Sequence, residues 1–89
     1  MISENITIIN KLGLHARAAS KLVNKASQYE SDVLIDKQGS RVDAKNIMGV
    51  MMLAASKGTE IVLEIDGKDE KNCMEAILQL INNRFDEAE

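Results

Sequence analysis

One histidine is the residue of this chain with the clearest chemical potential. His15 is the only histidine among the 89 residues, and it follows Gly13-Leu14 directly before a stretch with helical spacing. We therefore expect it beside unpaired backbone N–H groups and the positive end of a helix dipole. That position disfavours a positively charged ring and leaves a neutral imidazole with a nucleophilic nitrogen at physiological pH.

Arg17 lies two residues further on and adds a fixed cation whose forked N–H donors match phosphate oxygens. The backbone N–H groups of Ala16 and Arg17 complete a cradle for a dianion at the helix N-terminus. No carboxylate or serine close in sequence suggests a proton relay. A nucleophile, an anion cradle and basic neighbours together predict transient phosphorylation of His15. The alternative is that His15 only caps the helix or lies in an exposed loop.

The distribution of charge supports an anionic ligand or an acidic partner. The net charge is -3, yet the stretch from Asn5 to Tyr29 contains no acidic residue. Its basic residues, which would give this part of the protein a positive field, are Lys11, Arg17, Lys21 and Lys25. The alternative is solvated surface charge without a role.

Composition excludes several classes of protein. A single cysteine, Cys73, forms no internal disulfide and fits a reducing, cytoplasmic compartment. One Cys and one His fall short of a zinc site, so we expect no metal and no cofactor. No apolar run reaches the roughly 18 residues of a membrane span, and no signal peptide is visible. An acidic chain with 2% aromatic residues also argues against a nucleic-acid partner.

The hydrophobic periodicity predicts the elements that position these residues. Strands are expected at 6–8, 33–35, 41–42 and 61–65, and helices at 16–29, from Asn46 to before Gly58, and after a capping Asp69. The order is βαββαβα, an α+β pattern. Each helix has one apolar face, so the helices should cover one side of an antiparallel sheet. We expect residues 1–89 to form a single domain.

The short helix after Asn46 carries a second cluster, because it is apolar on almost every side. An open sheet lets such a helix bury one face. Val50 and Leu53 are expected in the core, leaving Ile47, Met48 and Met51 as an exposed patch. Flexible Met side chains suit a surface that fits more than one partner. The alternative, that the Met residues fill a thin core, stays open mainly for Met52.

Two segments resemble the motifs of a known family. Residues 13–19, Gly-Leu-His-Ala-Arg-Ala-Ala, resemble the phosphorylation-site motif of HPr, the histidine-containing phosphocarriers of the phosphoenolpyruvate-dependent phosphotransferase system. Residues 40–53 resemble the family's second signature, and the similarity extends from about Ile6 to Phe85. The resemblance implies an open-faced β-sandwich, with a four-stranded antiparallel sheet of order 1-4-2-3 covered on one face by three helices.

The resemblance also implies a function. His15 would accept a phosphoryl group on Nδ1 from enzyme I and pass it to IIA-type acceptor domains, with Arg17 assisting at the phosphoryl group. Such a protein is a carrier rather than a free-standing catalyst, and we expect a cytoplasmic, bacterial monomer. The expected partner surface lies beside His15, has a rim of Arg17, Lys21 and Lys45, and comprises Ala16, Ser20, Lys21, Ile47, Met48 and Met51.

Two positions depart from the family pattern. Ala18 stands where many members have proline, and alanine should preserve the first helical turn. Asn46 stands where members in some bacteria carry a regulatory serine, and an amide cannot accept that phosphoryl group. Control by a serine at this position is therefore excluded, whereas the chemistry of His15 is unaffected.

Alternative functions remain at this point. Within the family, the chain could serve the nitrogen-related regulatory branch rather than sugar uptake. From another class, it could be a binding module that acts through the same surface without being phosphorylated, although His15 and Arg17 together count against this. A small RNA-binding domain would need exposed aromatic residues, and only Tyr29 and Phe85 are present.

Overall fold

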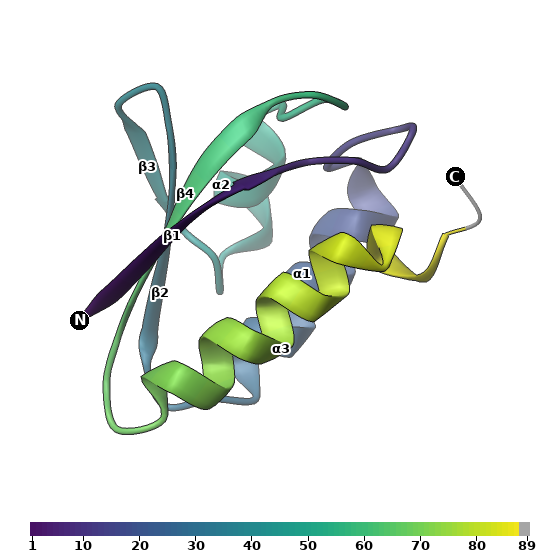
Figure 1. Cartoon of the computed structure of the whole chain (residues 1–89). Helices are drawn as coiled ribbons and strands as arrows, with labels where there is room; N and C mark the ends of the chain where they lie inside the picture. The colour runs from purple at the N-terminus through teal and green to yellow at the C-terminus, as the bar shows by residue number, and fades with distance from the viewer. Residues whose placement is uncertain (88–89) are drawn as a thin grey trace.

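The sheet at the centre of the molecule has the predicted strand order. A computed structural model describes residues 1–87. All pairings in its sheet are antiparallel, in the order β1-β4-β2-β3. The strands, drawn in Figure 1, are β1 (Ile2–Thr7), β2 (Asp32–Lys37), β3 (Ser40–Asp43) and β4 (Glu60–Asp66).

Side-chain alternation explains why one face of the sheet is covered. Ile61, Leu63 and Ile65 of β4 are buried, and Val33 and Ile35 lie opposite them on β2. β1 begins at Ile2, four residues before the predicted start, and ends at Thr7. Its residues 3–5 are polar and exposed at the sheet edge, so alternating hydrophobicity does not reveal this part of the strand.

Three helices pack on the buried face: α1 (Ala16–Ser27), α2 (Ile47–Met52) and α3 (Glu70–Asn82). Figure 1 shows α1 and α3 side by side, with α2 between α1 and the end of the sheet. α1 ends two residues before the predicted Tyr29. The N–H groups of Gln28 and Tyr29 bond three residues back instead of four, which tightens the last turn. No helix among residues 1–87 combines the length and hydrophobicity of a membrane span.

Asp69 precedes α3 as predicted, but the prediction that its side chain caps the helix is wrong. The carboxylate forms no cap hydrogen bond and instead accepts hydrogen bonds from the backbone N–H groups of Glu30 and Ser31 and from the Ser31 hydroxyl. These bonds, led by that of the hydroxyl, hold the pKa of Asp69 below its ordinary value. Asp69 therefore joins the α1–β2 connection to the start of α3.

The chain after α3 turns back towards the start of α1, a feature that the sequence analysis did not predict. Arg84, Phe85 and Asp86, the turn η1, have φ angles of 56°, 54° and 63°, in the left-handed region. The Phe85 side chain is fully buried, and Lys21 Nζ donates a hydrogen bond of 2.6 Å to the Phe85 carbonyl. We call Arg84–Glu87 the C-terminal segment.

Candidate functional site

A pinned loop between β1 and α1 places His15. The N–H of Leu14 donates to the carbonyl of Ala55 at 2.8 Å, and the Leu14 side chain is buried. Gly13 has a φ of +66°, and a Cβ there would lie 2.7 Å from Ser56 Cα. Only glycine fits such a turn against a neighbouring backbone without strain. The two residues before His15, Gly13 and Leu14, are thus held against the segment Ala55–Ser56.

His15 occupies the N-cap position of α1, but its ring does not cap the helix. The backbone there is extended, with φ −71° and ψ 176°, and the His15 carbonyl accepts the N–H of Ala19 at 2.8 Å. The side chain makes no cap hydrogen bond, and 27% of it is exposed. The alternative that the imidazole only caps α1 is therefore wrong.

The imidazole instead contacts Glu87 of the C-terminal segment. His15 Nε2 lies 2.5 Å from Glu87 Oε2, and the buried Asn10 donates a hydrogen bond of 2.9 Å from Nδ2 to Glu87 Oε1. The bond from Asn10 and then that from His15 hold the pKa of Glu87 below its ordinary value. Asn10 Nδ2 also donates to the carbonyl of Gly13 at 2.9 Å, so a single amide ties the loop to the carboxylate.

Glu87 is the site residue that sequence reasoning missed. It lies 72 positions from His15, and the search for a proton relay considered only neighbours in sequence. No local sequence pattern predicts the contact between Glu87 and His15, because this contact depends on the left-handed turn at Arg84–Asp86. The one available signal is the buried aromatic residue Phe85, which anchors a segment otherwise rich in charge.

The first turn of α1 presents the predicted anion-binding groups. Arg17 and Ala16 are exposed, and within residues 1–87 the Arg17 side chain makes no hydrogen bond or ion pair. The backbone N–H groups of Ala16 and Arg17 carry no hydrogen bond to any described residue. Ser20 and Lys21, one turn further on, are half-buried, and Lys21 also lies 4.0 Å from Asp86 Oδ2. The described part of the chain holds no cluster of three or more His, Cys, Asp or Glu side chains suited to a metal ion.

α2 exposes Ile47, Met48 and Met51, as the sequence predicted, and also Met52. Val50 and Leu53 are buried, and the Asn46 side chain caps the helix by accepting the N–H groups of Met48 and Gly49. Met52 is 78% exposed, so the alternative that it fills the core is wrong. The apolar patch is defined by the exposed large side chains of this helix, Ile47, Met48, Met51 and Met52.

α2 runs antiparallel to α1, which places the two ends of the apolar patch at different distances from His15. Its C-terminal end lies by the start of α1, because Ala55 bonds to Leu14. Its N-terminal end lies by the end of α1, because Lys45 Nζ donates to the Tyr29 carbonyl at 2.9 Å. That carbonyl is on the order of 20 Å along α1 from His15. Lys45 therefore lies at the end of α2 that is far from His15 and two residues before Ile47, and its place in the rim of the apolar patch stays a prediction.

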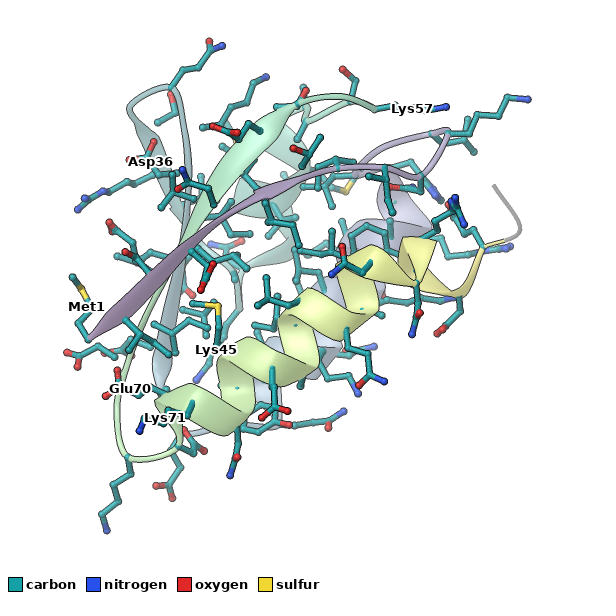
Figure 2. The ribbon with its side chains drawn as sticks, in the orientation of Figure 1. Met1, Asp36, Lys45, Lys57, Glu70 and Lys71 are labelled. Carbon is teal, nitrogen blue, oxygen red and sulfur yellow. The ribbon has the colours of Figure 1, made fainter. Side chains whose placement is uncertain are left out.

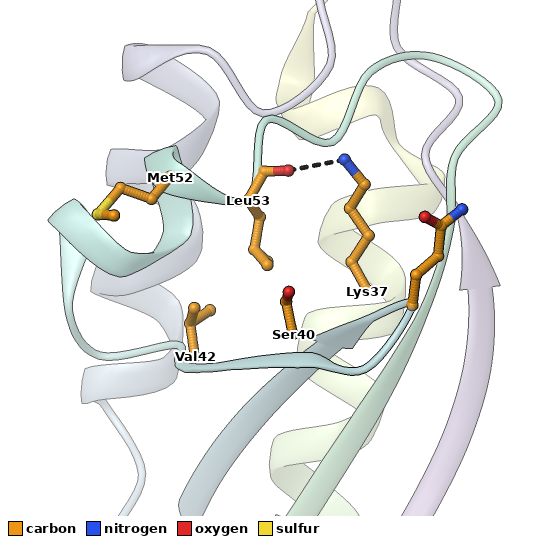
Figure 3. A pocket seen from close by; sticks show the side chains of 6 residues that line it. Lys37, Ser40, Val42, Met52 and Leu53 are labelled. Atoms are coloured by element: carbon orange, nitrogen blue, oxygen red, sulfur yellow. Dashed lines mark hydrogen bonds between the residues drawn. The ribbon is translucent and has the colours of Figure 1, made fainter.

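A shallow cavity lies beside α2 at the edge of the sheet (Figure 3). Its volume is about 340 Å³, and its lining residues are Lys37, Gln38, Ser40, Val42, Met52 and Leu53. Lys37 Nζ already donates a 2.8 Å hydrogen bond to the Leu53 carbonyl across it. None of the lining residues contacts His15 in the bonds described above, so this cavity is separate from the histidine site.

Comparisons with known proteins show the family and the fold of the chain. A family profile described as "PTS HPr component phosphorylation site" matches residues 2–83. A relative, the phosphocarrier protein HPr of Neisseria meningitidis serogroup A, is 56% identical over 89 residues, which cover 100% of both chains. The crystal structure of HPr-C-His from Thermoanaerobacter tengcongensis is 39% identical, covers 100% of both chains and superposes with a TM-score of 0.97.

One similar structure bears on assembly. The crystal structure of Crh, a catabolite repression protein of Bacillus subtilis, is 38% identical, with 94% of this chain and 97% of that chain covered and a TM-score of 0.76. It is described as a dimer with a swapped domain. The monomer predicted from the present sequence stays a prediction.

Proposed function

The chain belongs to the HPr family of phosphocarrier proteins of the phosphotransferase system, and we propose that it carries its phosphoryl group on Nδ1 of His15. The observation that carries this proposal is the arrangement of the ring. Nε2 is occupied by Glu87, whereas Nδ1 has no hydrogen-bond partner within residues 1–87. Nδ1 is therefore the nitrogen available to a phosphoryl donor.

Arg17 and the start of α1 would stabilise the phosphoryl oxygens. Arg17 is exposed and makes no interaction within the described residues, so its guanidinium can turn towards an arriving anion. The N–H groups of Ala16 and Arg17 add two donors and the positive end of the helix dipole. Donors fixed in place before the reaction stabilise charge on the transferring group without reorganisation.

The family acts between enzyme I and IIA-type acceptors, and we propose that both partners dock on one surface of this chain. That surface joins Ala16, Ser20 and Lys21 of α1 to Ile47, Met48 and Met51 of the apolar patch. Met52 extends the patch, because it is the most exposed side chain of α2. An apolar centre next to a basic edge suits acidic partners that bind transiently.

The protein would act as a carrier and not as a free-standing catalyst, because it presents one nucleophile and an anion cradle on an open surface. It would need no metal or cofactor for this transfer. Asn46 uses its amide oxygen to cap α2 and has no hydroxyl, so a serine kinase finds no acceptor there. Regulation would then act through His15 itself.

The test is phosphorylation with phosphoenolpyruvate and catalytic amounts of enzyme I. We expect mass spectrometry to show one added phosphoryl group that is labile in acid and stable in base, as phosphoramidates are. His15→Ala should show no adduct, whereas the control Ser3→Ala, at an exposed position of β1 outside the proposed docking surface, should be labelled like the wild type. An unchanged adduct in His15→Ala would falsify the assignment. Offering the labelled protein to sugar-branch and nitrogen-branch IIA domains identifies the branch that it serves.

A further inference from the structure

We propose that Glu87 is a positioning residue of the phosphoryl site: it holds the proton of His15 on Nε2 and balances the positive charge that the ring gains on phosphorylation. This inference rests on the proposed function and adds to it a partner for the histidine from the other end of the chain. Two observations and one chemical argument support it: the contact of Glu87 with His15, the way in which Glu87 is held, and the chemistry of the transfer.

The contact defines the tautomer of the ring. An ionised carboxylate can only accept hydrogen bonds, so the 2.5 Å contact between Glu87 Oε2 and His15 Nε2 requires a proton on Nε2. Two hydrogen bonds, from Asn10 and from His15, keep this carboxylate in its ionised form. With the single proton of a neutral imidazole on Nε2, Nδ1 keeps its lone pair in the ring plane.

Glu87 is held in place by several anchors. Only 15% of its side chain is exposed, and the donor to its second oxygen, Asn10, is fully buried. The preceding residues adopt left-handed backbone angles that L-residues avoid, so packing must hold them there. That packing is the buried ring of Phe85 and the bond from Lys21 Nζ to its carbonyl.

The chemistry of the transfer needs a partner at Nε2. The Nδ1 lone pair forms a bond to phosphorus, the bond between phosphorus and the donor breaks, and its electron pair returns to the donor. The Nε2 proton stays in place, so the phosphorylated ring becomes positively charged. Glu87 faces that charge, in the way that a carboxylate stabilises imidazolium in a catalytic triad. Because the ring remains protonated, it is also a good leaving group when the acceptor attacks the phosphorus.

The variants Glu87→Ala and Glu87→Gln separate the two parts of this role, and Asp86→Asn is the matched control. Asp86→Asn removes the carboxylate of the neighbouring residue, which lies near Lys21 and not at the His15 ring. Glutamine can still accept the Nε2 proton through its amide oxygen but carries no charge. Urea unfolding of each variant shows whether the fold is intact.

The first measurement needs no partner protein. In ¹⁵N-edited NMR spectra of the unphosphorylated wild type, we expect a ring proton on Nε2 that exchanges slowly with water. The same proton should exchange rapidly in Glu87→Ala and stay protected in Glu87→Gln and Asp86→Asn. A wild-type proton on Nδ1, or the same exchange rate in Glu87→Ala and wild type, would overturn the inference.

The second measurement is the single-turnover rate of transfer from phospho-enzyme I. We expect Glu87→Ala to be slower by about 10- to 100-fold, by analogy with the loss that follows removal of the hydrogen-bond partner of a metal-bound histidine. Glu87→Gln should be intermediate, and Asp86→Asn should match the wild type. If Glu87→Ala transfers the phosphoryl group at the wild-type rate, the inference about Glu87 is wrong, whereas the proposed phosphorylation of His15 still holds. Failure to phosphorylate the wild type would instead refute the proposed function, and the ring spectra would still decide the Glu87 contact.

Discussion

Replacing Met48 with aspartate should abolish most partner binding while leaving the fold intact. Met48 belongs to the apolar patch, and 66% of its surface is exposed in the free protein. Burying a whole Met side chain is worth about 1.5–3 kcal/mol, so covering this exposed part contributes about 1–2 kcal/mol to a complex. An unpaired polar group in the same contact costs about 1–3 kcal/mol more. The expected loss is therefore about 2–5 kcal/mol, or about 30-fold to several thousand-fold in Kd.

The same substitution should not destabilise the free protein. Residue 48 is the second residue of α2, directly after the Asn46 cap and Ile47. A carboxylate in a first turn interacts favourably with the helix dipole, by about 0.3–1 kcal/mol. Asn72→Asp is the matched control: it also adds one negative charge to the first turn of a helix, in α3. That turn carries Glu70 and Lys71, which Figure 2 shows at the opposite end of the molecule from Lys57, the residue after Ser56 in the segment that contacts Gly13.

Surface plasmon resonance against immobilised enzyme I tests this prediction, with circular dichroism and urea unfolding in parallel. Met48→Asp should mainly raise the dissociation rate, because buried contacts set the lifetime of a complex. The wild-type association rate should fall as salt rises past about 0.1 M, where the screening length is about 10 Å. If Met48→Asp binds like the wild type with an intact fold, α2 is not the docking surface and the reasoning fails.

Two further predictions concern Arg17 and Asp69. Arg17→Ala should unfold at the wild-type urea concentration yet transfer the phosphoryl group more slowly, since the exposed side chain makes no interaction within the described residues; equal single-turnover rates would remove Arg17 from the mechanism. The pKa of Asp69 is lower in the folded than in the unfolded protein. The ionised carboxylate therefore adds to the free energy of unfolding above its unfolded-state pKa, and this contribution is lost as the pH falls through its folded-state pKa. Between neutral and acidic pH, the Tm of Asp69→Asn should therefore fall less steeply than that of the wild type. Parallel plots of Tm against pH for the two proteins would contradict a stabilising role of the Asp69 carboxylate.

Much of the fold could be predicted because its signals are local. The alternation of Ile61, Leu63 and Ile65 specifies a half-buried strand, and the Asn46 side chain caps a helix two residues away. Both depend on neighbours within a few residues. The exposure of Met48 and Met51 was predictable for a similar reason, since a helix on an open sheet buries only one face.

The predicted side-chain cap at Asp69 failed because of a contact between distant parts of the chain. Asp69 is placed correctly for a cap, but Ser31, 38 positions away, competes for its carboxylate. The hydrogen bond from Lys45 to the Tyr29 carbonyl is likewise absent from any local pattern, because it depends on the antiparallel packing of α2 on α1. Sequence spacing gives the residue type and the element, whereas tertiary packing decides which partner a long side chain meets.

The contact with Glu87 raises an electrostatic question, because a carboxylate beside the histidine should repel an incoming phosphoryl dianion. The two ring nitrogens separate the charges: Glu87 faces Nε2, and in the proposed transfer the phosphoryl group would arrive at Nδ1. Glu87 repels the phosphoryl dianion throughout its approach. Its stabilisation of the imidazole, in contrast, grows as positive charge develops on the ring. An interaction that strengthens along the reaction speeds the chemical step even when it weakens the initial encounter. The positive charge of Arg17 and the N-terminus of α1 would offset this repulsion. The site is thus polarised across the imidazole, and this favours a phosphoryl group that is accepted readily and passed on readily.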